Sequence, residues 1–357
     1  MSFLFIGSTG DHAGHSLTAW AIARSLVEQG LRVGFIKPFG THPVNIGGIW
    51  SDYDAFLFKN VLDLQEPIDR ICPYLLTEEA CKQNMSGEII EEIISIAQEF
   101  SVEKDILIIM GSEHIFFDDS SQPVPDISLI NELNADFVLV NRYRDTSRSI
   151  YSILSVSSLL KERVKGIIIN RVPPERLEEA RNKLIPSLIQ KGIPITTALP
   201  EDPVLSFWSL REIKDVLNGE LLWGEESLGR SVGGMTVGSA DLTGGLLLFK
   251  RAYNKIVLLE PASLDSEIDQ PSAKRPVAGI LLTGGRNPAP RLLEAAKMAN
   301  TPLMLVKEDT FAALESLEHT SAPLSAKDEQ KVRYFTELMD SEGAFDRLFQ
   351  SLGLRIV

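Results

Sequence analysis

The sequence predicts an α/β protein in which a doubly wound, mostly parallel sheet is followed by a second, smaller α/β domain. Short apolar runs alternate with longer amphipathic stretches up to about residue 217, a pattern typical of βαβ units. Runs such as 106–109 contain no polar residue, as expected for strands covered on both faces. The 357 residues are enough for about two domains with separate cores.

The elements of the first domain follow from this alternation. Strands are expected near residues 2–6, 31–36, 105–110, 136–141, 164–170 and 195–199. Helices are expected near residues 16–29, 87–100, 147–161 and 175–191. Gly30 and Gly192 follow two of these helices, where a left-handed cap favours glycine.

The periodicity weakens after residue 217, which places a linker at 218–229 between a domain of residues 1–217 and one of residues 230–357. In the second domain, strands are expected near 231–237, 255–259, 277–282 and 303–306. Helices are expected near 241–250, 290–299 and 309–317, with a longer one over 327–352. The apolar stripe of this last helix packs in the core or against a partner subunit. Its members are Val332, Phe335, Leu338, Met339, Phe345, Leu348, Phe349 and Leu352.

Composition and charge exclude several classes of function. The chain has 49 acidic and 35 basic residues, a net charge of −14, which argues against binding to nucleic acid or to anionic membranes. The apolar runs fall far short of the roughly 20 residues that cross a bilayer. The first residues lack the basic region of a signal peptide. Cys72 and Cys81 are too few for a disulfide framework, so a cytoplasmic location is expected.

The strongest chemical motif is the segment 8–16 between the first strand and the first helix. Gly10 and Gly14 allow the chain to turn closely around an anion, which the helix N-terminus attracts. The usual phosphate loop ends in Gly-Lys-Ser/Thr, but here His15 replaces the lysine, while Ser16 retains the magnesium-binding hydroxyl. The alternative is an ordinary glycine-containing turn.

From this loop onward, the first domain resembles the dethiobiotin-synthetase-like domain found in the N-terminal part of many bacterial phosphotransacetylases. The resemblance runs through residues 34–40, 43–54, 71–73, 168–170 and 199–203. It implies a P-loop fold that binds ATP, or another nucleotide, with magnesium.

The resemblance also implies roles for three further residues. Lys37 matches a lysine that binds substrate and intermediates, and is the candidate catalytic residue; the alternative is a solvated charge. Asp54 resembles a magnesium-binding aspartate, although a surface pair with Asp52 or a helix N-cap is the alternative. Asn170 matches a position that contacts the nucleotide base, or is a simple turn residue.

The sequence departs from the family at two charged positions. Met110 stands where active enzymes carry a magnesium-binding glutamate, and His15 is positively charged only when protonated. Glu113, Asp118 or Asp119 would have to substitute for the glutamate. Phosphoryl transfer depends on neutralising the charge on the phosphate, so loss of catalysis is expected. His12 and His114 lack zinc-ligand spacing.

The second domain resembles the DRTGG domain through residues 233–235, 241–245 and 282–286. Leu242 replaces the arginine of the motif in the first Thr-Gly-Gly copy. Each Gly-Gly pair forms either a tight turn or an anion-binding nest, and Arg286 is placed to assist an anion. The resemblance implies dimer contacts and regulation.

The leading hypothesis is a regulatory or sensory protein: a degenerate P-loop domain that binds a nucleotide or another phosphorylated metabolite, joined to an oligomerising DRTGG module. Long phosphotransacetylases carry their acyltransferase domain after these two, and the chain ends at Val357, so no acetyl transfer is expected. The expected partner is an enzyme of acetate or acetyl-CoA metabolism. The alternatives are an ATP-dependent ligase of the dethiobiotin synthetase or cobyrinic acid a,c-diamide synthase type, and a structural scaffold.

Overall fold

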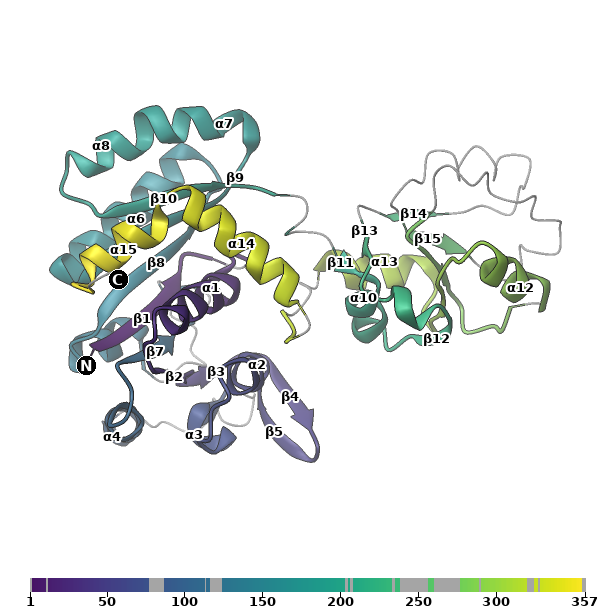
Figure 1. The fold of residues 1–357 in the computed structure, drawn as a ribbon, viewed down its shortest axis with the longest axis horizontal. Helices are drawn as coiled ribbons and strands as arrows, with labels where there is room; N and C mark the ends of the chain where they lie inside the picture. Colours follow the sequence, from purple (N-terminus) through teal and green to yellow (C-terminus); the bar gives the residue numbers. More distant parts are fainter. Residues whose placement is uncertain are drawn as a thin grey trace. The chain divides into compact units, whose positions relative to one another are not determined.

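A computed structural model shows the chain folded into two compact units (Figure 1). It describes residues 2–10, 12–76, 87–112, 114–115, 124–202, 205, 208–232, 235–237, 256–259, 277–288, 290–319, 324–326 and 328–354. Unit 1 comprises Met1–Glu201 together with Leu324–Val357, and unit 2 comprises Asp202–Pro323. Unit 2 is therefore inserted into the sequence of unit 1.

Unit 1 is built on a sheet of six strands in the order β10-β9-β8-β1-β7-β2, all parallel. The strands are β1 (Ser2–Ser8), β2 (Val33–Ile36), β7 (Ile106–Met110), β8 (Asp136–Arg142), β9 (Val164–Val172) and β10 (Ile195–Pro200). This confirms the predicted doubly wound sheet. The order reverses at β1, and ligands of such sheets bind beyond the carboxyl ends of the strands at this point.

Helices connect these strands. They are α1 (His15–Glu28), α4 (Gly87–Ser101), α5 (Asp126–Glu132) and α6 (Thr146–Leu160), followed by α7 (Pro174–Glu179), η3 (Ala180–Leu184) and α8 (Ile185–Ile189). The single helix expected over 175–191 thus contains a π-helical turn, η3. Pro186 supplies no backbone N–H just beyond that turn, which interrupts the regular hydrogen-bond pattern.

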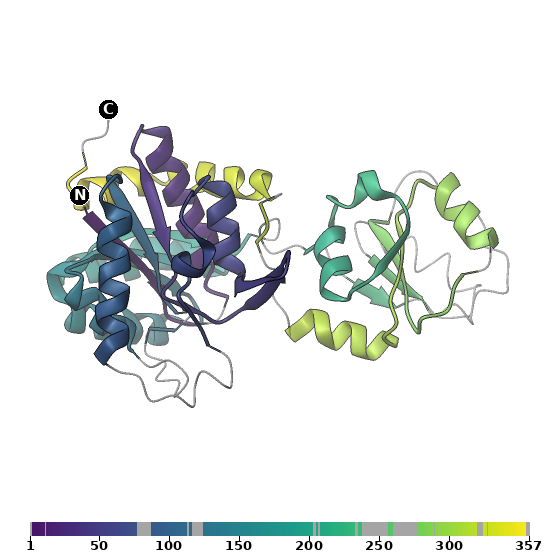
Figure 2. The same ribbon diagram turned by 90° about the horizontal axis from the view of Figure 1, so that it is seen from below.

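The C-terminal segment corrects the predicted domain organisation. The helix expected over 327–352 is two helices, α14 (Glu329–Ser341) and α15 (Ala344–Ser351), separated by Gly343 with φ 61°. Both belong to unit 1: α14 packs on α1, and α15 packs on β9 and β10 (Figures 1 and 2). Most of the apolar stripe, including Phe335 and Phe349, is buried. The stripe is therefore intramolecular core.

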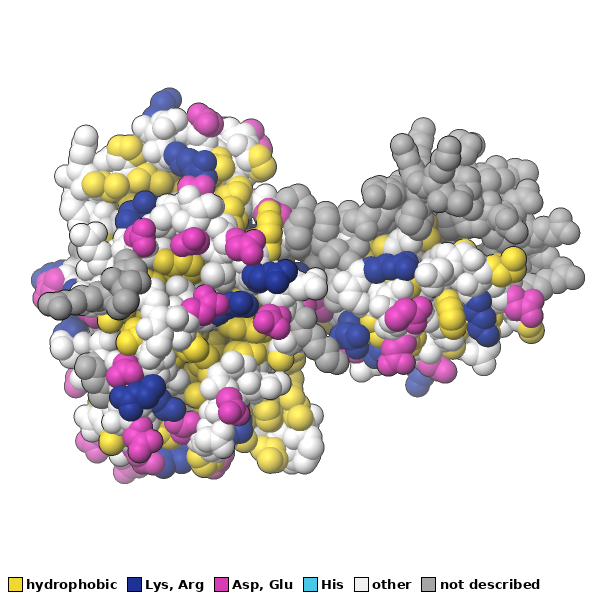
Figure 3. Space-filling view, in the orientation of Figure 1, with side chains coloured by type: hydrophobic (Ala, Val, Ile, Leu, Met, Phe, Trp, Pro, Cys, Tyr) yellow, Lys and Arg dark blue, Asp and Glu magenta, His cyan; other side chains and the backbone are white. Residues whose placement is uncertain are grey.

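A small hairpin, which the sequence analysis did not predict, precedes the second helix of unit 1. It consists of β4 (Pro43–Ile46) and β5 (Ile49–Asp52), joined by two glycines with φ 63° and 88°, as a two-residue turn of this kind requires. Its tip exposes Ile46, Ile49 and Trp50, and Figure 3 shows hydrophobic side chains over this hairpin. The helices α2 (Tyr53–Val61) and α3 (Ile68–Ile71) and the short pair β3 (Phe39–Gly40) and β6 (Tyr74–Leu75) complete this region.

Unit 2 contains a sheet of five strands in the order β12-β17-β16-β15-β14, of which only β12 runs antiparallel to its neighbour. The strands are β12 (Glu220–Trp223), β14 (Met235–Val237), β15 (Ile256–Leu259), β16 (Gly279–Leu282) and β17 (Leu303–Leu305). The described helices are α10 (Leu210–Val216), the short 3-10 helix η4 (Glu225–Ser227), α12 (Pro290–Met298) and α13 (Thr310–His319), and β11 (Trp208–Ser209) pairs with β13 (Ser231–Val232).

The boundary between the units lies earlier than the predicted linker at 218–229. That linker contains β12, and α10 packs in the core of unit 2, where Leu210 and Ile213 join Leu281 and Met304. The helix expected over 241–250 lies outside the described residues. Among the helices that the structure describes, none is long and apolar enough to span a bilayer.

Candidate phosphate-loop site

The loop between β1 and α1 has the geometry that the sequence predicts for anion binding. Gly14 adopts a left-handed conformation with φ 85° directly before α1, and no side chain caps the helix there. A Cβ atom at Gly14 would lie 2.7 Å from Nδ2 of Asn170, so glycine is required on two grounds. The backbone N–H of Thr18 donates to the Gly14 carbonyl at 3.0 Å, starting the helix. The positive end of α1 therefore faces the loop.

Ser16 and Asp54 meet at this helix terminus, although they are 38 positions apart in the sequence. The Ser16 side chain hydrogen-bonds to the Asp54 carboxylate, and His15 lies close enough for its charge to act on the same group. His15 itself is buried. A hydroxyl beside a carboxylate supplies the oxygen ligands that Mg²⁺ prefers together with ligand phosphates. The two residues therefore fit the predicted magnesium site.

Lys37 lies in a buried ion-pair cluster with two carboxylates. Its Nζ is 2.7 Å from Oδ2 of Asp54 and 2.9 Å from Oδ1 of Asp52. All three side chains are buried. The alternatives of a solvated lysine and of an acidic surface pair are thus wrong. Asp52 also accepts hydrogen bonds from the backbone N–H groups of Asp54 and His42, each at 2.9 Å, so it is the N-cap of α2 as well.

The cluster shifts the pKa values of its members. Burial by itself lowers the pKa of Lys37, but the carboxylates of Asp54 and Asp52 outweigh burial and raise it above its ordinary value. Burial by itself raises the pKa of Asp54, but Lys37, His15 and the hydrogen bond from Ser16 lower it overall. Lys37 is therefore protonated and Asp54 ionised at neutral pH. A lysine in this state can hold an anion but does not serve as a base.

The end of β7 lacks the expected glutamate and is tightly packed. Met110 is buried, and its thioether is unsuited to magnesium. A Cβ atom at the adjacent Gly111 would lie 2.5 Å from both Phe5 and Asp126. The carboxylate of Asp126, which the sequence analysis missed, accepts hydrogen bonds from the backbone N–H and the hydroxyl of Ser112, each at 2.8 Å. This buried acid thus holds the backbone after β7.

The acids proposed to replace the missing glutamate cannot be placed. Glu113, Asp118 and Asp119 lie outside the described residues. Among the described residues, no group of three or more His, Cys, Asp or Glu side chains is arranged to hold a metal ion.

Asn170 contacts the loop itself. Its Nδ2 donates to the carbonyl oxygen of Ala13 at 2.8 Å, and the neighbouring Arg171 donates to the carbonyl oxygen of His12 at 3.0 Å. Arg171 has φ 58° and also pairs with Glu201 at 3.3 Å. The end of β9 therefore holds the loop in position.

Comparison with known protein families assigns both parts of the chain to families. Residues 3–208, well over half of the chain, match the profile of the AAA domain family AAA_26. The chain belongs to this AAA domain family. Residues 212–320 match the DRTGG domain.

Relatives of the chain include phosphate acetyltransferases and dethiobiotin synthetases. The phosphate acetyltransferase of Synechocystis sp. is 24% identical over 98% of this chain and 52% of its own length. That of Pseudomonas aeruginosa is 23% identical over 99% of this chain and 52% of its own. The ATP-dependent dethiobiotin synthetase BioD of Thermodesulfovibrio yellowstonii is 25% identical over 55% of this chain and 87% of its own. The chain spans about half the length of the acetyltransferases it matches.

In the DRTGG domain, the backbone bends at the second Thr-Gly-Gly copy. Gly284 and Gly285 have φ 83° and 67°, and their N–H groups donate to the carbonyl oxygens of Glu308 and Val306 at 2.7 and 2.9 Å. Arg286 is exposed beside them. Because these N–H groups donate to the segment that follows β17, they are not available to an anion, and the pair forms no anion-binding nest. The strings at 233–234 and 241–245 lie outside the described residues.

The structure of the AAA domain also reveals side chains that the sequence analysis missed. Nη2 of Arg144, which follows β8, lies 3.5 Å from the position that a Cβ atom on Gly10 would take. The hydroxyl of Thr9 accepts a hydrogen bond from Nδ2 of Asn141 at 2.9 Å. The sequence feature that could have revealed them is the pair Arg142 and Arg144, two basic residues at the end of a strand in an acidic protein.

Proposed function

We propose that this protein is a regulatory or sensory protein whose AAA domain binds ATP with magnesium, or another phosphorylated metabolite, with little or no turnover. The observation that carries the proposal is the loop itself. It keeps the glycine geometry and the contact between Ser16 and Asp54, but has His15 in place of lysine, and β7 ends in the buried Met110. The chain thus keeps residues that bind a phosphate group, but lacks two of the charges that would stabilise the transition state of phosphoryl transfer.

The balance of charge explains why binding is favoured over catalysis. Phosphoryl transfer requires fixed positive groups that neutralise the transferred phosphate. Lys37 pairs with two buried carboxylates, and their negative charge offsets its positive charge. Ser16 and Asp54 would hold magnesium, which would screen the phosphates when bound. The residues that remain at the loop can orient a nucleotide, but they do not supply all the positive charges that phosphoryl transfer requires.

The DRTGG domain and the phosphate acetyltransferase relatives support a role in regulation. We propose that the protein acts in the cytoplasm as a homo-oligomer, on an enzyme of acetate or acetyl-CoA metabolism. A phosphorylated small molecule of that metabolism is the proposed signal. Light scattering of the purified chain tests the oligomeric state, and a monomer at micromolar concentration would contradict it.

The alternative is an ATP-dependent ligase that activates a carboxylate, as dethiobiotin synthetases and cobyrinic acid a,c-diamide synthases do. The cluster of Lys37, Asp52 and Asp54 beside Ser16 favours it, because it places a cation and oxygen ligands at the loop.

Calorimetric titration with ATP, ADP and acetyl phosphate, with and without magnesium, separates the two functions. We expect binding of at least one of these compounds, and weakening by Ser16→Ala. An assay of ADP release in the presence of small carboxylic acids should show no sustained turnover. Sustained ADP release would establish the ligase, and no binding of any of the three compounds would leave only a scaffold.

A further inference from the structure

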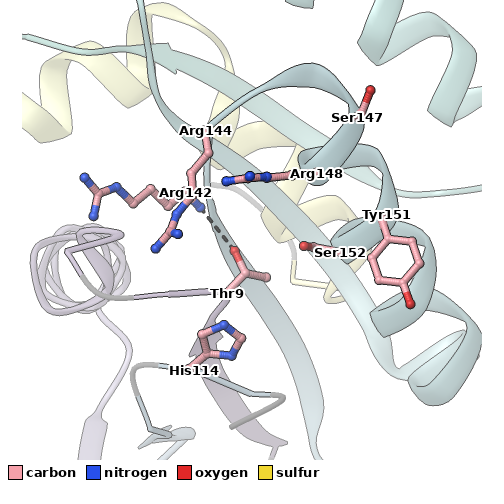
Figure 4. Close-up of a pocket in the computed structure, with 8 residues that line it drawn as sticks. All are labelled: Thr9, His114, Arg142, Arg144, Ser147, Arg148, Tyr151 and Ser152. Atoms are coloured by element: carbon pink, nitrogen blue, oxygen red, sulfur yellow. Dashed lines mark hydrogen bonds between the residues drawn. The ribbon is translucent and has the colours of Figure 1, made fainter.

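A hollow lies beside the phosphate loop, at the carboxyl ends of β1 and β8 and against α6 (Figure 4). Its volume is about 490 Å³, and the residues that line it include Thr9, Arg142, Arg144, Arg148 and Ser152. None of its described lining residues is acidic. We call this hollow the arginine pocket.

The charges in the arginine pocket are only partly compensated. Arg148 pairs with Asp145, with Nε 3.2 Å from the carboxylate. No carboxylate among the described residues pairs with Arg144. Figure 4 shows Arg148 extending from α6 toward Arg144, with Thr9 below them. Among the described residues, the guanidinium groups of Arg144 and Arg148 therefore share one acidic partner, Asp145, in a chain whose net charge is −14. Such a local excess of positive charge attracts a small anion.

Hydrogen-bond donors face the same space. The Thr9 hydroxyl already accepts from Nδ2 of Asn141 at 2.9 Å and from the backbone N–H of Arg142 at 3.3 Å. Its own proton is therefore left to donate to a third group. Guanidinium groups bind phosphate and carboxylate through paired hydrogen bonds, so Arg144, Arg148 and Thr9 together match an oxyanion. Pockets of roughly 300–1,000 Å³ are typical of small-molecule sites.

We propose that the arginine pocket binds a small polyanion with phosphate or carboxylate groups, at a site that borders the phosphate loop and shares Thr9 with it. The site depends on Arg144 and Arg148, whereas the nucleotide site depends on Gly14, Ser16 and Asp54. The two sites are neighbours, because Arg144 lies over Gly10. A polyanion in the pocket therefore lies where it can influence what the loop binds.

The test is calorimetric titration of the full chain with pyrophosphate and, separately, with citrate, at low ionic strength, where charge attraction is least screened. We expect at least one of the two to bind, and the double variant Arg144→Gln, Arg148→Gln to bind it at least tenfold more weakly. The matched control, Arg176→Gln with Arg333→Gln, removes the same charge at exposed positions of unit 1 and should bind as the unaltered protein does.

Further measurements distinguish a loss of binding from a loss of folding, and one bound anion from the other. Circular dichroism and the unfolding midpoint should be the same in all variants, because the altered side chains are exposed or line a hollow. Pyrophosphate alone would identify a phosphate ligand, and citrate alone a carboxylate. The inference is overturned if neither anion binds, or if binding survives the double arginine variant. Loss of pyrophosphate binding in Ser16→Ala, but not in the arginine variant, would assign the anion to the phosphate loop instead.

Discussion

Lys37 shows how a single residue links the fold to the site. Its ammonium lies between Asp52, which caps α2, and Asp54, which contacts Ser16 at the start of α1. Separating these charges inside the protein is costly, because water does not replace the lost partner. The position of the Asp54 carboxylate, and so of any magnesium ion held with Ser16, thus depends on Lys37.

Replacing Lys37 tests this dependence. Lys37→Met leaves two buried carboxylates without their cation, and we expect the free energy of unfolding to fall by about 3–5 kcal/mol. Urea unfolding of unit 1 measures this. The control Lys165→Met removes a partly exposed lysine, 3.6 Å from Asp136, and should cost little. Equal effects of the two substitutions would show that the buried cluster adds no stability.

The same cluster predicts how stability changes with pH. The pKa of Asp54 is below its ordinary value in the folded chain, so its contribution is present above about pH 4 and is lost as the pH falls through the folded pKa. The pKa of Lys37 is raised, so its contribution is lost as the pH rises above about 10.4. Unfolding free energies measured from pH 2 to 11 test both the loss of stability in acid and the loss of stability in alkali. Asp54→Asn should flatten the acid limb; an unchanged acid limb would contradict the assignment.

The two positions at which the chain departs from the family, His15 and Met110, provide another prediction. Restoring the family charges with His15→Lys and Met110→Glu should strengthen binding of ATP with magnesium about tenfold, because the resemblance implies that these two charges act on the phosphates and the metal. Calorimetry measures the affinity. His42→Lys, at an exposed position, is the control. Since Met110 is buried, the unfolding midpoint is measured too; a folded double variant with unchanged affinity would refute the alignment of these positions.

At the scale of elements, the break between α14 and α15 explains why the C-terminal segment joins unit 1. The apolar stripe predicted a helix over 327–352, and its period continues through both helices. Gly343, with φ 61°, turns the chain between them, so that α15 reaches β9 and β10 while α14 stays on α1. A side chain at this φ is strained, whereas glycine is not.

Gly343→Ala is therefore expected to destabilise unit 1 by about 1 kcal/mol, the order of the cost of a left-handed conformation in a residue with a Cβ atom. The nearest atom to that Cβ would be Nη1 of Arg347 at 3.3 Å, and this guanidinium also donates to the carbonyl oxygens of Thr196 and Glu342, so the close contact adds to the backbone strain. Thermal unfolding measures the change. Ser351→Ala, at an exposed position of α15, is the control and should have no such cost.

At the scale of the whole molecule, unit 2 is an insertion between β10 and α14. Unit 1 is complete only when residues 324–357 join residues 1–201. We expect a variant in which a flexible Gly/Ser linker replaces residues 202–323 to fold, with a cooperative thermal transition. A chain ending at residue 323 should lose that transition or unfold at a much lower temperature, because α14 and α15 no longer cover α1, β9 and β10. A linker variant without a cooperative transition, together with a chain ending at residue 323 that keeps it, would contradict the division into these two units.

The sequence by itself determined the alternation of strands and helices, the phosphate loop with Gly14 and Ser16, and the substitutions His15 and Met110. These features are local, because they depend on periodicity and on residues adjacent in the chain. Only the tertiary structure decided that both Asp52 and Asp54 face Lys37, that α14 and α15 complete unit 1, and that Arg144 lies over Gly10. These contacts join residues distant in the sequence, and packing, which a local pattern does not encode, selects them.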